Sequence, residues 1–96
     1  MTRVELTKLA RQEFLDLICT RELPESEAFA RVEAALAQLA AHPESGQVVA
    51  GPRYLEVRML GIGWSWFCLL YLYDQEAGRV TVTTFYDARM LGTPRP

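Results

Sequence analysis

Lysine, histidine and cysteine are scarce in this chain, and each shortage excludes a class of function. Lys8 is the only lysine and His42 the only histidine. With 10 basic and 12 acidic side chains, the net charge of −2 excludes the broad basic surface that nonspecific nucleic-acid binding requires. One histidine and the two separated cysteines, Cys19 and Cys68, cannot assemble a zinc site, and we predict no metal and no cofactor. Both cysteines lie among apolar residues and are expected to be buried.

Long hydrophobic runs are also missing. No apolar stretch approaches the roughly 20 residues that span a bilayer, and the opening MTRVELTK lacks the pattern of a signal peptide. We therefore expect a cytoplasmic protein without membrane contacts. A length of 96 residues with 50% hydrophobic residues fits one globular domain over 1–96, with a loosely ordered tail from about residue 90.

Helices are predicted in the first half of the chain, after a short strand at 3–6 whose residues alternate polar and apolar. Thr7 is a candidate N-cap for a helix over 8–20, and a second helix runs from 25 to 41 and ends at His42. Apolar side chains at helical spacing predict the buried faces, which are Leu9, Ala10, Phe14, Leu17 and Ile18 in the first helix and Phe29, Val32, Leu36, Leu39 and Ala40 in the second.

Strands are predicted in the second half, after a loop over 42–52. Apolar and polar residues alternate over 55–59, which is typical of a strand with one buried face. Residues 64–73 are apolar almost throughout, which favours a central strand covered on both faces. A turn at 74–78 leads into a last strand over 80–85.

These elements predict an α+β fold with the order β-α-α-β-β-β. A helical hairpin should pack on one face of a small twisted antiparallel sheet, with the first strand on an edge. Tyr71 and Tyr73 project to the same face of their strand as Phe67 and Leu69, so we expect both tyrosines in the core.

This order of elements resembles the RelE/ParE superfamily, the toxins of bacterial type II toxin–antitoxin modules. The likeness covers about residues 4–89 and rests on AAHPESG after the second helix, Arg53 before a strand, Tyr71 near the end of the central strand and Arg89 beyond the last one. It implies a toxin that a cognate antitoxin neutralises, with DNA contacted only through the antitoxin. The sequence leaves open whether the chain forms a homodimer. RelE-like members cut messenger RNA on the ribosome, whereas ParE-like members resemble gyrase inhibitors without nuclease chemistry.

Cleavage of RNA requires a base, an acid and cations that stabilise the charged phosphate. By the resemblance, Arg58 and Arg89 match two cation positions, Glu56 stands where another basic residue is usual, and Cys68 replaces an arginine. No tyrosine follows Arg89. A carboxylate repels phosphate unless it serves as the base, so we predict a ParE-like toxin that binds a protein target. The alternatives are a RelE- or HigB-like ribosome-dependent ribonuclease using Arg58, Arg89 and Glu56, and a non-toxic binding module that retains the fold.

Target or antitoxin binding is predicted for five residues, which are Arg53, Arg58, Trp64, Trp66 and Arg89. The alternative is that these side chains have a purely structural role. Arg58 would be the solvated face of a half-buried strand, Arg89 would pair with Asp87 or Asp74, and the tryptophans would be buried under the helices.

Overall fold

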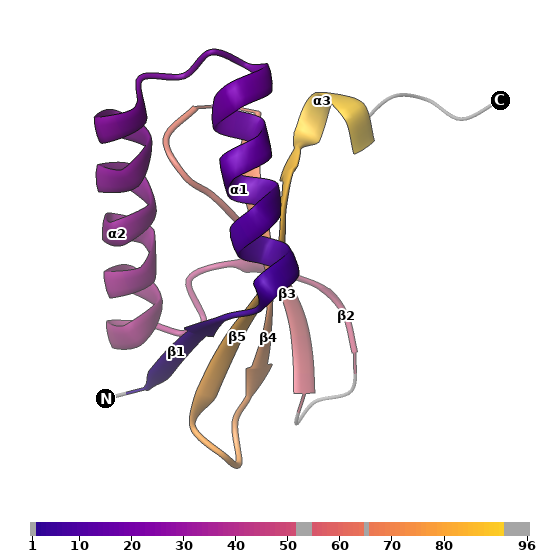
Figure 1. The fold of residues 1–96 in the computed structure, drawn as a ribbon. Helices are drawn as coiled ribbons and strands as arrows, with labels where there is room; N and C mark the ends of the chain where they lie inside the picture. The colour runs from indigo at the N-terminus through magenta and orange to yellow at the C-terminus, as the bar shows by residue number, and fades with distance from the viewer. Residues whose placement is uncertain (1, 52–54, 65, 92–96) are drawn as a thin grey trace, which may run out of the picture.

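The structure is a computed structural model that describes residues 2–51, 55–64 and 66–91 (Figure 1). Its elements are β1 (Arg3–Leu6), α1 (Lys8–Thr20), α2 (Glu25–Ala41), β2 (Gln47–Ala50), β3 (Leu55–Gly61), β4 (Phe67–Asp74), β5 (Arg79–Asp87) and α3 (Ala88–Leu91). The predicted α+β class is confirmed, and both long helices have the predicted bounds. Two short elements, β2 and α3, were not predicted. None of the helices in the described ranges is long and apolar enough to cross a membrane.

The five described strands form one sheet in the order β1-β5-β4-β3-β2. Strands β2 to β5 make an antiparallel meander, whereas β1 pairs parallel to β5 with Val4 opposite Val80. The edge position predicted for β1 is therefore correct. The sheet is therefore mixed, and the prediction of an antiparallel sheet is wrong for this strand. The residue pattern of a short edge strand does not encode its direction.

Strand β2 corrects the prediction of a loop over 42–52. It pairs antiparallel with β3, with an irregularity between Val48 and Ala50, and all four of its residues are exposed. Alternation of polar and apolar residues marks only those strands that bury one face. An edge strand that buries neither face carries no such signal. The loose tail predicted from about residue 90 begins within α3 (Ala88–Leu91), and residues 92–96 lie outside the described residues.

The core lies between the helices and one face of the sheet. Figure 1 shows α1 and α2 as an antiparallel pair, and both contribute to the same buried cluster as the sheet. Its largest fully buried side chains are Leu39 from α2, Phe67, Leu69 and Tyr71 from β4, and Val80 and Val82 from β5. Aromatic rings fill the part of this cluster beside the start of β4, where the centroid of the Phe14 ring of α1 lies 5.3 Å from that of Phe85 and 6.0 Å from that of Phe67.

The buried face of each helix is narrower than predicted. Leu9 is 62% exposed and Phe29 is 42% exposed, and Cys19, expected to be buried, is exposed as well. In α2 the inward positions are instead occupied by small side chains such as Ala28 and Ala35. Hydrophobicity alone does not tell which of two adjacent residues points inward. Both positions are compatible with the 3.6-residue period of the helix.

Strand β4 is central, as predicted, but the helices cover only one of its faces. The strand begins at Phe67, and Trp64 belongs to the preceding turn, where the Phe67 N–H donates to the Trp64 carbonyl at 3.1 Å. Leu70 and Leu72 point away from the helices and are half-buried. The nearly continuous apolar run was therefore wrongly interpreted as a strand covered on both sides.

The exposed part of the β5 edge is closed by α1. Strand β1 ends at Leu6, and Thr7 then caps α1 as predicted, its hydroxyl accepting from the Ala10 N–H at 3.0 Å. One turn further, the Glu13 carboxylate accepts from the Phe85 N–H at 3.3 Å and from the Thr84 hydroxyl. These bonds provide acceptors for β5 beyond the point where β1 stops.

Replacing Leu39 with alanine should test the core, because this side chain is completely buried in the cluster. We expect Leu39→Ala to lower the free energy of unfolding by about 2–5 kcal/mol, measured by urea denaturation. The exposed Leu9→Ala is the matched control and should change it by less than about 0.5 kcal/mol. Equal effects of the two substitutions would show that the assignment of the helix faces is wrong.

Candidate functional site

Arg58, a predicted site residue, lies in a hydrogen-bonded network on the helix side of the sheet. It faces the same side as Tyr71, its partner across β3 and β4. Its Nε donates to the Glu56 carboxylate at 2.7 Å, and its Nη1 donates to the backbone carbonyls of Glu44 and Gly46 at 2.9 and 2.6 Å. The side chain is only 11% exposed. Arg58 is thus not on the solvated face of a half-buried strand, because alternation along β3 turns it towards the loop after α2.

Tyr71 completes this network from the central strand. Its hydroxyl accepts from the Gly46 N–H at 2.9 Å and donates to the Pro43 carbonyl at 2.7 Å. The hydrogen bond that Arg58 donates to the Glu56 carboxylate raises the pKa of Arg58 above its usual value, and burial raises the pKa of Tyr71. Both groups therefore keep their protons at neutral pH, and the network holds the loop after α2 against the sheet.

Gly46 is required where this loop meets the sheet. A Cβ atom built there would lie 2.6 Å from the Met59 carbonyl oxygen and 2.7 Å from the Tyr71 hydroxyl. Only glycine lets the backbone approach both groups this closely. The bonds to Gly46 thus fix the start of β2.

Asp87 forms a second polar cluster at the other end of the sheet. Its carboxylate is 3% exposed and accepts from Arg21 Nε at 3.0 Å, from Arg89 Nη2 at 2.8 Å and from the Arg89 backbone N–H at 2.9 Å. These bonds, above all the one from the Arg89 guanidinium, hold the pKa of Asp87 well below its usual range despite the cost of burial. The predicted pairing of Arg89 with Asp87 is confirmed.

The two tryptophans lie beside this second cluster and are half-buried, packed against the core. The Arg89 guanidinium lies 4.7 Å from the centroid of the Trp66 ring, and the Arg31 guanidinium lies 4.6 Å from that of Trp64. Trp66 also stacks on Phe67 at 5.3 Å. Arg89 itself keeps a side chain that is 61% exposed.

The structure therefore separates the predicted site residues into two groups. Arg58 and Glu56 lie at the level of Tyr71 on β4, whereas Arg89 and the tryptophans lie at the level of Phe67. Four residues along a strand correspond to roughly 13 Å, which places the groups at different ends of the sheet. Arg53 lies outside the described residues.

Neither a reactive Cys68 thiol nor a metal site is found among the described residues. Burial raises the pKa of the Cys68 thiol, so it stays protonated at neutral pH. The described residues contain no group of three or more histidine, cysteine, aspartate or glutamate side chains that could hold a metal ion.

Comparison with solved structures identifies the fold. The chain is similar to the archaeal RelE–RelB complex from Pyrococcus horikoshii (TM-score 0.70, 16% identity, 92% of this chain and 97% of that one). It is also similar to the intact RelBE toxin–antitoxin complex of E. coli (TM-score 0.65, 17% identity, 92% of this chain and 98% of that one). The RelBE2 toxin–antitoxin complex of Mycobacterium tuberculosis matches as well (TM-score 0.60, 22% identity, 91% of this chain and 92% of that one). The chain has the fold of the RelE toxins. No family model and no curated protein sequence matches it.

Within this RelE fold, the sheet face opposite the helices is apolar. Val57 and Met59 of β3 pair with Leu72 and Leu70 of β4, and all four side chains are half-buried and point away from the core. On β5 this face continues through Thr81, opposite Leu72, and Tyr86, opposite Cys68. The centre of the open face is therefore uncharged and consists of half-buried apolar side chains.

Sequence reasoning missed Asp87 as a site residue and considered it only as a partner of Arg89. Its signal was present, because Asp87 precedes Arg89 by two residues at the end of an apolar strand. The third member, Arg21, is 66 residues away in the sequence. Only the packing of the α1 end against β5 brings these three side chains together.

Removing the Tyr71 hydroxyl should test the first network. Tyr71→Phe leaves the buried Gly46 N–H and Pro43 carbonyl without this partner, so we expect a loss of about 1–3 kcal/mol in the free energy of unfolding. Tyr73→Phe, on the same face of β4, is the control and should cost less than about 0.5 kcal/mol. Chemical denaturation measures both, and a neutral Tyr71→Phe would contradict a structural role for the network.

Neutralising Asp87 should destabilise the fold in a pH-dependent way. At pH 7 we expect Asp87→Asn to cost about 2–3 kcal/mol, because the charged hydrogen bonds to two arginines weaken. The folded-state pKa lies below the unfolded value of about 3.9, so this contribution is present above that value and is lost as the pH falls towards the folded pKa. The difference between wild type and variant should thus shrink in acid.

Urea denaturation at a series of pH values measures this difference. Asp16→Asn, an exposed aspartate on α1, serves as the control and should show little change at any pH. A gap that stays constant from pH 7 to pH 3 would mean that the Asp87 carboxylate is not the group that stabilises the cluster.

Proposed function

We propose that this chain is the toxin component of a type II toxin–antitoxin pair and is neutralised by a cognate antitoxin. The observation that carries the proposal is the match, over 91–92% of the chain, to three solved complexes of RelE toxins with their antitoxins. The apolar open face around Met59 and Leu70 supports it, since a partner surface there would remove half-exposed apolar area from water.

Within that role, we propose that the chain acts by binding a protein target, as ParE-like toxins do. Arg58 is engaged by Glu56 and two backbone carbonyls in the interior, and the centre of the open face is uncharged. Arg58 and Arg89 also lie at different ends of the sheet. One phosphate group would therefore not contact both arginines without a rearrangement of the first network.

A RelE-like ribosome-dependent ribonuclease is the second candidate, favoured by the likeness to solved RelE structures. Its strongest residue is Arg89, whose largely exposed guanidinium is oriented by Asp87 and by the Trp66 ring. A well-placed cation of this kind contributes on the order of 3–4 kcal/mol to a charged transition state. Arg89→Ala would then abolish RNA cleavage while the Tyr71 network stays intact.

Inducible expression in bacterial cells tests the proposal. We expect growth arrest that is relieved when the neighbouring gene is co-expressed and its product co-purifies with the chain. Met59→Gln and Leu70→Gln on the open face should weaken that complex at least about tenfold, whereas the exposed Leu9→Gln should not. Normal growth at high levels of folded protein, with no binding by the neighbouring product, would contradict the toxin role.

Labelling of new DNA and protein in arrested cells distinguishes the two mechanisms. For a ParE-like toxin, DNA synthesis stops first and translation continues. For a ribonuclease, translation stops first and cleaved messenger RNA accumulates. Cleavage sites that disappear with Arg89→Ala would establish the second mechanism.

A further inference from the structure

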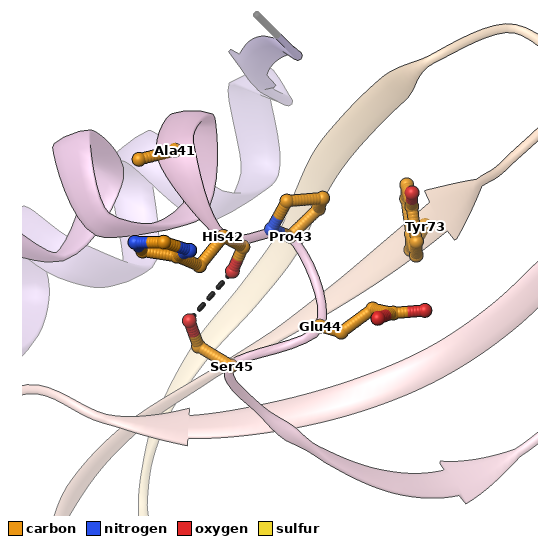
Figure 2. Close-up of a pocket in the computed structure, with 6 residues that line it drawn as sticks. All are labelled: Ala41, His42, Pro43, Glu44, Ser45 and Tyr73. Carbon is orange, nitrogen blue, oxygen red and sulfur yellow. Dashed lines mark hydrogen bonds between the residues drawn. The ribbon is translucent and has the colours of Figure 1, made fainter.

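A pocket of about 500 Å³ lies at the C-terminal end of α2, away from the open face. It is lined by Ala41, His42, Pro43, Glu44, Ser45 and Tyr73. Figure 2 shows the Glu44 side chain extending to the same side of the loop as the Tyr73 ring, while the His42 imidazole points the other way. The aromatic ring and the carboxylate thus form two walls of the pocket.

The end of α2 gives this pocket a negative potential. The carbonyl groups at a helix C-terminus carry partial negative charge, and the last turn of α2 contains no basic residue to balance it. Pro43 lacks an N–H, so it cannot donate to the Leu39 carbonyl four residues earlier, as the next helical residue would. The Leu39 carbonyl at the helix end therefore lacks its usual donor, whereas the neighbouring Ala40 carbonyl accepts from the Thr2 N–H at 3.2 Å.

Glu44 adds a full negative charge at the same place. Its side chain is exposed, and it takes part in none of the ion pairs found between described residues. The neighbouring cation is Arg58, which donates to the Glu44 backbone carbonyl but is paired with the Glu56 carboxylate. Arg58 and Glu56 together are neutral, so among the described residues the charge of Glu44 is offset only by the weaker Coulombic attraction to Arg58.

We infer that this pocket binds the guanidinium group of an arginine presented by a partner protein. A guanidinium is planar, so it stacks on a tyrosine ring while its edge donates hydrogen bonds to a carboxylate and to backbone carbonyls. A lysine ammonium is a point charge and gains less from the ring. The net charge of −2 on this chain favours a basic partner segment. That the arginine belongs to the antitoxin rests on the proposed function; the binding of guanidinium does not.

Titration of the full-length, isotope-labelled chain with argininamide tests this inference by NMR. We expect shifts confined to the amides of residues 41–45 and Tyr73, with a dissociation constant on the order of millimolar, as one side chain provides. Lysinamide should bind at least about threefold more weakly, because it lacks the planar group. Glu44→Gln should weaken argininamide binding about tenfold, since a charged hydrogen bond is lost.

Glu33→Gln is the matched control, because Glu33 is an exposed glutamate on α2, distant in sequence from the pocket, and its loss should leave argininamide binding unchanged. Tyr73→Leu should remove the preference for arginine over lysine; if it unfolds the chain, the Glu44→Gln result decides alone. Shifts spread over all exposed carboxylates, or equal effects of Glu44→Gln and Glu33→Gln, would overturn the inference. The titration uses the isolated chain, so its result is independent of the growth assay for toxicity.

Discussion

The structure depends on one tyrosine hydroxyl at the centre of the sheet. Tyr71 belongs to the core through its ring, and its hydroxyl provides both a donor and an acceptor for the loop that follows α2. Arg58 binds two carbonyls of the same loop from the neighbouring strand. Backbone groups buried without partners are costly, so these two side chains stabilise the loop where it lies against the sheet. Strand β2 begins directly after it and takes its position from the same bonds.

Asp87 has the corresponding role at the opposite end. One buried carboxylate connects the end of α1, the end of β5 and the start of α3 through Arg21 and Arg89. Buried carboxylates are stable only when they are paired, and here the second arginine also packs on Trp66. The helical layer is thus joined to the sheet at both ends by charged groups, with apolar packing between them.

These two clusters influence what the molecule can do. Arg58 and Asp87 are engaged in holding the fold together, and Arg89 is paired with Asp87, whereas the open face of the sheet is left apolar and uncharged at its centre. An uncharged face suits a protein partner better than a polyanion, because binding to phosphate gains its affinity from cations. The same fold can therefore support different functions, depending on which side chains it directs inwards.

Local patterns in the sequence were enough to predict the α+β class, the bounds of both long helices, the central strand and the likeness to RelE/ParE toxins, because periodicity and capping are local properties. Contacts between distant segments were needed to show that β1 is parallel to β5, that residues 47–50 form a strand, and that Leu9 and Cys19 face outwards. The tertiary structure also decided the environment of the site residues. Arg58 follows the alternation of its strand, yet its burial depends on a loop 12–14 residues earlier, and Asp87 depends on an arginine 66 residues away. Such contacts are set by packing between distant segments, which no local pattern records.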